Sequence, residues 1–320
     1  MLLMHFVVGT FSVSLMAFGL GMASGQDYPN KPVRIVTSGV GGGSDFIARQ
    51  VAQGIADRLG QPVIVDNRGS GVAPGEAVAQ APADGYAILV GSNSLWTGPL
   101  LQKTSYDPVR DFSPISMTTR APLFVVVHPS LPVKSVKDLI ALAKAKPGQL
   151  NYSTGSIGAS THLAAELFKS MAGVNIVRVS YKTAAMQATD LISGYVQLHF
   201  GSGGTVAAHV KSGKLRAVAI TSASPSALAP DLPTVAGSGV PGYEFVALDG
   251  IFAPAKTPEI IIKRLNQEIV RFLNLAETKE RFLKSGIEAA SSSPEQFAAA
   301  IKSEIVRLGR VIKDAGIKLE

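Results

Sequence analysis

A run of glycines separates the first predicted strand of this chain from its first predicted helix. Gly39 and residues 41–43 follow a short β-branched run at 33–36, and Ser44 and Asp45 then open an amphipathic segment. Glycines let backbone N–H groups approach a ligand, and a helix N-terminus favours negative charge. This order of elements predicts an anion-binding site. The alternative is a turn that binds nothing, although such turns usually span about 2–6 residues with fewer glycines.

A second loop of small residues repeats this arrangement in the middle of the chain. Residues 151–154 are predicted to form a strand, the small residues 155–161 follow it, and a helix is expected from His162. If the helix N-termini at Ser44 and Ser160 face each other across a cleft, they can bind two carboxylates, or one carboxylate from both sides. His162 is either a donor to the ligand or a packing residue.

Strands and helices alternate along most of the chain, which predicts an α/β fold with doubly wound parallel sheets. The strands predicted at 33–36, 62–65 and 87–90 each end in a small polar loop, and ligands bind at such carboxyl ends. The pattern is irregular from 104 to 114, and a new apolar strand is predicted at 123–128. A second domain is therefore expected to begin between these segments. The strand predicted at 248–253 is expected to return to the first domain. The other predicted helices are 135–146, 258–275, 278–285 and 294–315, and the other predicted strands are 176–181, 195–200 and 215–221.

The composition restricts the partners and the chemistry. The 320 residues are 46% apolar and 17% charged, which is enough for two packed domains. The net charge of +7 suits anionic ligands, but no run of Lys and Arg and no interleaved aromatics point to nucleic acid. With no cysteine, the chain has no disulfide, thiolate metal site or cysteine nucleophile.

The first 25 residues have the pattern of an export signal. They contain no Asp, Glu, Lys or Arg, they are largely apolar, and they end in small residues before a polar stretch. We expect cleavage near Gly25 and Gln26, which would release the protein into the periplasm. An uncleaved membrane anchor is the alternative, since about 20 apolar residues can cross a bilayer.

Two enzymatic interpretations stay open as alternatives. The glycine loop nearly matches the dinucleotide fingerprint, with Ser44 at the last glycine position and Asp66 ending the next strand, which suggests an oxidoreductase. The third glycine is missing, however, and a soluble nicotinamide cofactor is a poor partner for an exported protein. No G-x-S-x-G motif occurs, so a hydrolase would need residues distant in sequence. The five histidines show no metal-binding spacing, and no cofactor is predicted.

Five ordered segments of this chain resemble the Bug family, the periplasmic solute receptors of tripartite tricarboxylate transporters. They read VRIVTSGVGGGSDFIARQ, ADGYAILVGSNS, LNYSTGSIGASTHLAAELF, ISGYVQLHFGS and GIFAPAKTPEIIIKRLNQEI. The resemblance implies a type II periplasmic-binding fold of two α/β domains that are joined by crossover segments and close on a ligand. It places a discontinuous domain 1 at 26–120 and 246–320 and domain 2 at 121–245.

The resemblance also implies a set of ligand-binding residues. In the family, the loops that follow the first strand of each domain bind ligand carboxylates, partly through water. Tyr181 and Lys182 match a third segment near the cleft, and Ser92 and Ser202 lie at polar strand ends. Asp45 is expected to cap rather than to contact an anion, since two carboxylates repel each other. The remaining predicted site residues are Gly41, Gly42, Gly43, Ser44, Ser153, Thr154, Ser156, Ala159, Ser160 and Thr161.

The chain departs from the family pattern after the strand at 195–200. Family members commonly carry an aspartate there, whereas this chain has Gly201 and Ser202. This loss argues against an ammonium-bearing ligand. Trp96 and Met186 are candidates for an apolar wall that would suit an aromatic carboxylate, or are simple packing residues. The sequence thus predicts a monomeric, cofactor-free receptor that is not an enzyme. It would capture a small carboxylate and deliver it to membrane transporter subunits or to a sensor.

Overall fold

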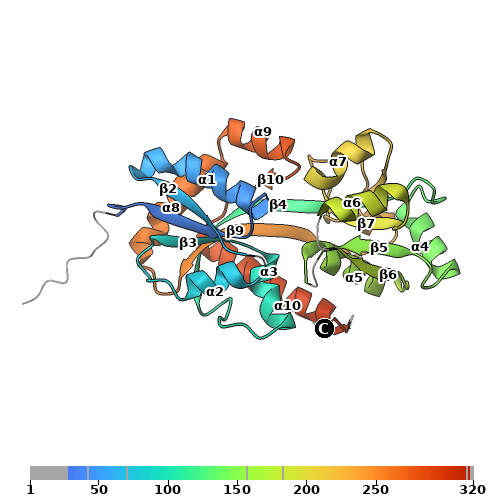
Figure 1. Ribbon diagram of the computed structural model, residues 1–320, viewed down its shortest axis with the longest axis horizontal. Coiled ribbons are helices and arrows are strands. Elements are labelled where there is room, and N and C mark those ends of the chain that lie inside the picture. Colours follow the sequence, from blue (N-terminus) through green and yellow to red (C-terminus); the bar gives the residue numbers. More distant parts are fainter. Residues whose placement is uncertain are drawn as a thin grey trace, which may run out of the picture.

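The computed structural model describes residues 28–41, 43–69, 71–155, 158–181, 184–314 and 316–317. The predicted export signal lies outside these residues. Figure 1 shows an elongated molecule in which two α/β lobes lie side by side along the long axis, connected by the strands β4 and β9. No helix of the described part is long and apolar enough to cross a membrane.

The first lobe is built on a sheet with the strand order β2-β1-β3-β9-β4. The first three strands are parallel, and β9 runs antiparallel to both β3 and β4. Its strands are β1 (Val33–Thr37), β2 (Val63–Asn67), β3 (Ala87–Ser92), β9 (Val246–Pro254), β10 (Glu288–Ala289) and the first part of β4 (Phe112–Val127). Its helices are α1 (Gly43–Leu59), α2 (Ala73–Ala79), α3 (Asn93–Leu101), α8 (Glu259–Leu273), α9 (Ala276–Lys284) and α10 (Pro294–Asp314). The short 3-10 turn η1 (Ala236–Ser238), which precedes β9 in the chain, packs with the second lobe.

The second lobe continues the sheet as β4-β7-β5-β6, with β8 also paired to β4. β5 is parallel to both β6 and β7, which matches the predicted βαβ pattern. Its strands are β5 (Asn151–Thr154), β6 (Val177–Ser180), β7 (Leu198–Ser202) and β8 (Arg216–Ile220), and its helices are α4 (Val136–Ala145), α5 (Ser160–Ala172), α6 (Ala184–Ser193) and α7 (Gly203–Lys211).

The strand β4 joins the two lobes, and its first half was not predicted. Residues 112–122 of β4 pair with β9, and residues 123–127 pair with β7 and β8. The sequence hides the first half because Pro114 removes a backbone donor and Ser116, Thr118 and Thr119 are polar although buried. The helix α3 was also missed, since residues 91–94 were expected to form a loop and Pro99 lies inside the helix.

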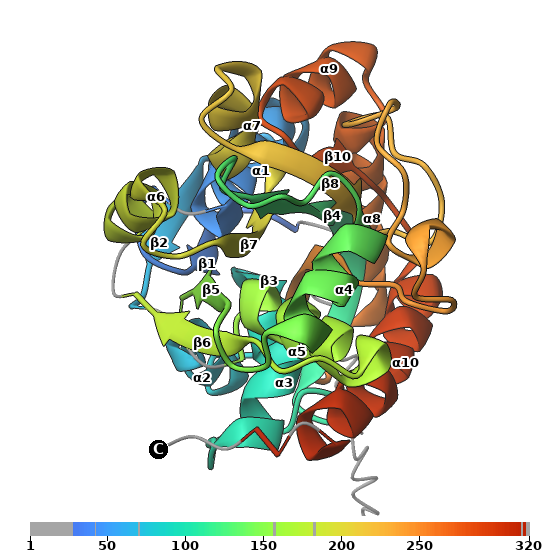
Figure 2. The ribbon, with the colours of Figure 1, turned by 90° about the vertical axis from the view of Figure 1, so that its right-hand side faces the viewer.

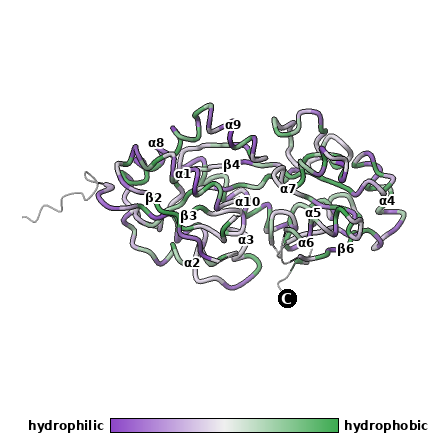
Figure 3. Tube along the Cα trace, turned by 45° about the horizontal axis from the view of Figure 1, so that its top comes forward, coloured by the Kyte–Doolittle hydropathy of each residue, from purple (hydrophilic) through white to green (hydrophobic). Residues whose placement is uncertain are grey.

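Apolar cores on both sides of the central strands stabilise the lobes, and α10 reaches into both of them. Phe297 and Ile301 pack in the core of the first lobe, whereas Leu308 and Ile312 pack in the core of the second. Figure 2 shows α10 running beside α5 along one side of the molecule. In Figure 3, hydrophobic positions follow β3, and hydrophilic positions lie on the outer helix α9. The boundaries at residues 120 and 246 stay a prediction.

A pair of helix glycines tests the packing of α1 on α8. A Cβ atom at Gly54 would overlap the ring of Phe272, whereas one at Gly309 in α10 would meet only Leu100 at 3.9 Å. Alanine is favoured over glycine inside a helix by about 1 kcal/mol. We therefore expect Gly309→Ala to raise the free energy of unfolding by about 0.5–1 kcal/mol. We expect Gly54→Ala to lower it by about 1–3 kcal/mol because of overpacking. Urea denaturation measures both, and a stabilised Gly54→Ala would contradict the packing of α1 against α8.

Candidate ligand-binding cleft

Residues of both lobes line a cavity of about 290 Å³. The first lobe contributes the start of α1 and the end of β3, and the second lobe contributes the starts of α5 and α7. A second cavity of about 710 Å³ shares Ser92 and Ser160 with the first and extends along α2 and α3. We call the two cavities together the cleft.

Seven of the predicted site residues line the cleft. They are Gly43, Ser44, Ser92, Ala159, Ser160, Thr161 and Ser202. Five others do not belong to its lining, namely Gly41, Asp45, Ser153, Thr154 and Tyr181. The last three, Gly42, Ser156 and Lys182, lie outside the described residues. The glycine loop and the second small-residue loop therefore meet, as the topology of the two lobes requires.

Helices α3, α5 and α7 present uncapped N-termini to the cleft. The first N–H groups of a helix have no partner inside the helix. At the N-cap residues Ser92, Ala159 and Ser202, no side chain accepts a hydrogen bond from these groups. The hydroxyls of the two serine N-caps have other partners. Ser92 Oγ lies 3.0 Å from Ser94 Oγ, and Ser202 Oγ lies 3.2 Å from Thr205 Oγ1. The N-termini are thus open to an anionic acceptor.

Asp45 organises the glycine loop from within α1. Its carboxylate accepts a hydrogen bond from Gly41 N at 2.9 Å and from Asn67 Nδ2 at 2.8 Å, and it pairs with Arg49 at 3.0 Å. Asn67 also donates to the Ser38 carbonyl oxygen at 2.7 Å. Burial alone would raise the pKa of Asp45, but these hydrogen bonds outweigh it and hold the pKa below its usual value. Asp45 thus fixes the loop conformation, and among the described residues none of its hydrogen-bond donors is a backbone N–H of α1 itself.

Ser153 and Thr154 lie behind the cleft wall rather than in it. Both are fully buried. Thr154 Oγ1 lies 2.9 Å from Thr161 Oγ1, and Ser153 Oγ accepts a hydrogen bond from Gln187 Nε2 at 3.2 Å. These two residues therefore position Thr161 and Gln187, which do line the cleft.

Tyr181, which was predicted to contact the ligand, does not line the cleft. Its hydroxyl donates a hydrogen bond to Asp190 at 2.8 Å within the second lobe. Burial and the neighbouring Asp190 raise its pKa, so the hydroxyl stays protonated. Trp96 is fully buried in the core of the first lobe and forms no ligand wall. Met186 is 55% exposed and does not line the cleft. The hypothesis that Trp96 and Met186 form an apolar ligand wall was wrong. Tertiary packing, which the sequence does not show, decides where these side chains lie.

The neutral histidines of the second lobe sit near the cleft. His199 lines it, and its Nδ1 lies 3.0 Å from the Ser153 carbonyl oxygen. Burial lowers the pKa of His199 to about 4, so the ring is uncharged at neutral pH. His162 Nδ1 accepts a hydrogen bond from Gly158 N at 3.1 Å, and burial lowers its pKa to about 4 as well. His162 therefore fixes the second loop, and it does not line the cleft.

Asp249 on β9 is the cleft residue that sequence reasoning missed. It lines the cavity beside the start of α1 and accepts hydrogen bonds from Ser44 Oγ and Thr119 Oγ1, both at 3.0 Å. Burial raises the pKa of Asp249, although the two hydroxyl donors oppose this. The sequence argued against an ammonium-bearing ligand because Gly201 and Ser202 replace the family's aspartate, but β9 supplies an acid to the cleft from the opposite lobe. Its only signal in the sequence is a carboxylate inside an otherwise apolar strand.

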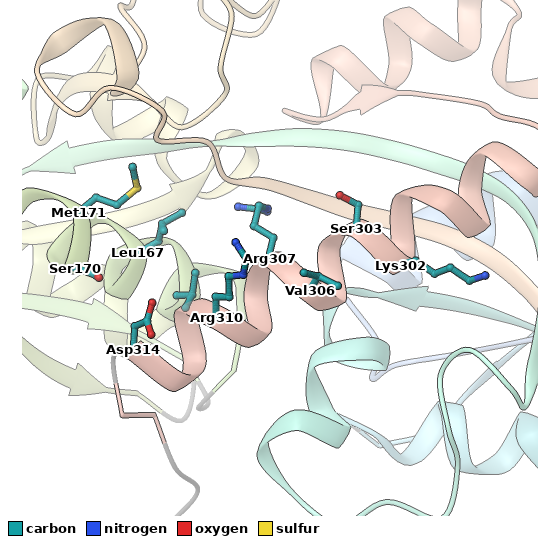
Figure 4. A pocket seen from close by; sticks show the side chains of 10 residues that line it. Leu167, Ser170, Met171, Lys302, Ser303, Val306, Arg307, Arg310 and Asp314 are labelled. Carbon is teal, nitrogen blue, oxygen red and sulfur yellow. The ribbon is translucent and has the colours of Figure 1, made fainter.

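The cleft is otherwise free of charged side chains among the residues described. Despite the net charge of +7, neither cavity is lined by a Lys or Arg of the described ranges. No cluster of metal-ligating side chains occurs in that part of the chain. A separate groove between α5 and α10 shares no lining residue with the cleft and carries Lys302, Arg307, Arg310 and Asp314 (Figure 4).

Glycine contacts flank the cleft where the lobes meet. A Cβ atom at Gly204, in the first turn of α7, would come within 2.8 Å of the Ser285 carbonyl oxygen at the end of α9. A Cβ atom at Gly203 would come within 2.9 Å of the Gly286 carbonyl oxygen. On the other side, Gly158 packs against Leu101 of α3. The lobes therefore approach so closely that only glycine fits at these positions.

Comparison with known proteins assigns the chain to a family. Residues 47–317 match the model of the tripartite tricarboxylate transporter family receptor. The Protein BugT of Bordetella pertussis is 36% identical, over 93% of each chain.

Among solved structures, a Rhodopseudomonas palustris protein with adipate has a TM-score of 0.82 at 34% identity, covering 91% of this chain and 99% of that one. The periplasmic binding protein BugD has a TM-score of 0.79 at 29% identity, covering 92% and 100%. MatC from the same R. palustris, with bound malate, has a TM-score of 0.78 at 25% identity, covering 89% and 100%.

This chain belongs to the tripartite tricarboxylate transporter receptor family, and its fold is that of the periplasmic binding proteins. The predicted resemblance to the Bug family is confirmed.

The carboxylate of Asp45 is expected to stabilise the fold in a pH-dependent way. Asp45→Ala leaves the Gly41 N–H and the Asn67 amide without their acceptor, which should cost about 1–3 kcal/mol at pH 7. Because the folded-state pKa lies below the unfolded value of about 3.9, this stabilisation is complete above pH 4 and is lost as the pH falls through the folded pKa.

Urea denaturation from pH 7 down to pH 3 measures the effect. Asp57→Ala, at an exposed position of the same helix, is the matched control and should stay near the wild type at every pH. A gap between wild type and Asp45→Ala that does not narrow in acid would contradict the role assigned to the carboxylate.

Proposed function

We propose that the protein captures a small carboxylate in the cleft and delivers it to the membrane subunits of a tripartite tricarboxylate-type transporter. The observation that carries this proposal is the convergence of the N-termini of α1, α3, α5 and α7 on one cavity shared by the two lobes. Helix N-termini hold carboxylates through backbone N–H groups and the helix dipole. The relatives solved with adipate and with malate support the same ligand class.

Binding would rest on backbone groups. Each helix terminus contributes roughly 0.3–2 kcal/mol beyond its hydrogen bonds, while micromolar affinity requires about 8 kcal/mol. Hydrogen bonds from uncapped N–H groups and from the hydroxyls of Ser160 and Thr161 supply part of the difference. Closure of the lobes supplies more, because water leaves the cleft and each polar interaction there becomes stronger.

The proposed boundaries make closure a movement of residues 121–245 against 26–120 and 246–320. The strands β4 and β9 cross between these parts, so bending at residues 120–123 and near 246 would swing one lobe against the other. In this scheme the contacts of Gly203 and Gly204 with the end of α9 belong to the closed form. A monomer suffices, because both walls of the cleft come from one chain.

We further propose a periplasmic location, reached through the signal in residues 1–25, and a protein without cofactor or catalytic activity. A receptor returns its ligand unchanged, so mass spectrometry of the released ligand distinguishes it from an exported hydrolase or oxidoreductase.

A thermal-shift screen tests the ligand class. We expect at least one carboxylate from a panel of citrate, malate, glutamate, nicotinate, benzoate and terephthalate to raise the melting temperature. Ligand at 100 times its Kd should stabilise the fold by about 2.7 kcal/mol. NAD and uncharged sugars serve as controls. A shift by NAD alone would favour the dinucleotide alternative and reject the receptor proposal.

Substitution at the first residue of α1 tests the location of the site. A Cβ atom at Gly43 would have no protein atom within 4 Å, and the residue lines the cavity. Gly43→Val should therefore fill ligand space and weaken binding of the best carboxylate by about tenfold or more, with little change in stability. Isothermal titration calorimetry measures the affinity.

The control for this substitution is Gly309→Ala in α10. A Cβ atom at Gly309 would meet only Leu100 at 3.9 Å among the described residues, and Gly309 does not line the cleft. Normal affinity in Gly43→Val, or an equal loss in the control, would place the ligand elsewhere.

A further inference from the structure

Asp249 is half-buried, and it lacks the basic partner that the most buried carboxyl groups of the described residues have. The side chains of Asp45, Glu166 and Glu268 are 5%, 10% and 6% exposed, and each has a Lys or Arg nitrogen at 3.0, 2.7 and 2.9 Å, respectively. Glu304 is paired with Arg307 in the same way at 2.8 Å. Among the described residues, Asp249 has only the hydroxyl donors Ser44 and Thr119. Charges shielded from water are normally paired, and burial raises the pKa of Asp249, so a cation that would match its charged form is missing from the part of the chain that the structure describes.

The described side chains around the cleft do not supply this cation. No Lys, Arg or His nitrogen of a described residue comes within 4.0 Å of the Asp249 carboxylate. The lining contains His199 and His209 but, within the described ranges, no Lys or Arg. His199 is uncharged at neutral pH, because burial lowers its pKa to about 4.

The position of Asp249 relates it directly to the proposed carboxylate site. Its Oδ1 accepts a hydrogen bond from Ser44, the second residue of α1, so the acid lies within one side chain of a helix N-terminus. A ligand carboxylate at that N-terminus would lie close to Asp249 and be repelled by it. A cationic group next to the ligand carboxylate removes this repulsion and pairs with Asp249. The two charges of an α-amino acid are separated by a single carbon, as this arrangement requires.

We propose that the cleft selects carboxylates that carry an ammonium group beside the carboxylate, as α-amino acids do, and that Asp249 binds the ammonium. This inference rests on the proposed receptor function and narrows its ligand class. The carboxylate is held by the helix N-termini, the ammonium pairs with Asp249, and Ser44 and Thr119 hold the Asp249 side chain in place. The ligand thus supplies the positive charge that the described residues of the cleft lining do not.

Calorimetric titration with matched ligand pairs tests the proposal. The pairs are aspartate and succinate, glutamate and glutarate, and phenylalanine and 3-phenylpropionate, which differ only in the ammonium group. The purified protein is first freed of co-purified ligand by unfolding and refolding. We expect at least one amino acid to bind about tenfold or more tighter than its partner. In Asp249→Asn, that amino acid should lose about 30-fold or more in affinity, while its partner should bind unchanged or tighter. Asp57→Asn, on the exposed face of α1, should change neither.

The outcomes separate this inference from the proposed function. Tight binding of the unsubstituted acids with no gain from the ammonium would overturn the inference and keep the receptor function. Equal losses for both members of a pair in Asp249→Asn would mean that Asp249 only anchors Ser44 and Thr119, or pairs with a cation of the protein, and would also overturn it. Binding by no member of either series would overturn the inference, and it would overturn the receptor proposal as well if no carboxylate of the thermal-shift panel binds.

Discussion

The antiparallel pairing of β4 with β9 is the interaction on which the cleft depends. It continues from Phe112 opposite Pro254 to Pro122 opposite Val246, and beyond it β4 enters the sheet of the second lobe. The same pairing sets Thr119 opposite Asp249, so that their side chains meet on one face of the sheet. A register slip of one residue would turn Asp249 away from the cleft. The strand pair thus both connects the lobes and fixes the one acid between them.

The convergence of helix N-termini follows from the topology. In a parallel βαβ unit each strand ends, and each following helix begins, at the same edge of the sheet. The two lobes turn these edges toward each other, so α1 and α3 face α5 and α7. The resulting concentration of partial positive charge explains how a cleft without Lys or Arg in its described lining can suit an anion. Side-chain caps would have neutralised it, and at Ser92, Ala159 and Ser202 they are absent.

Local signals in the sequence predicted much of the fold and the two loops of the site. Glycines before Ser44 and small residues before Ser160 predicted the helix starts. Loops whose backbone approaches a ligand closely need small residues, so the amino-acid composition reveals them. The first half of β4 and the helix α3 were not predicted. Tertiary contacts hold residues such as Pro114 and Pro99 in a strand or helix against their local preference. Tyr181 was misplaced and the role of Trp96 was left open for a related reason, because only packing decides that one side chain binds Asp190 and the other fills the core.

A site made of backbone N–H groups has a consequence for specificity. Such groups recognise a carboxylate whatever side chains surround them, so relatives that share the loops can share a preference for carboxylates in general. Discrimination among carboxylates must then come from the few side chains that face the ligand. In this protein Asp249 is the charged side chain among the described residues of the lining. It lies on β9, whereas the family pattern places an acid at Gly201 and Ser202 in the opposite lobe. In the proposed closure, Asp249 lies on the first-lobe side of the bend near residue 246, so its position relative to α1 would change little and it could select ligands before the lobes close.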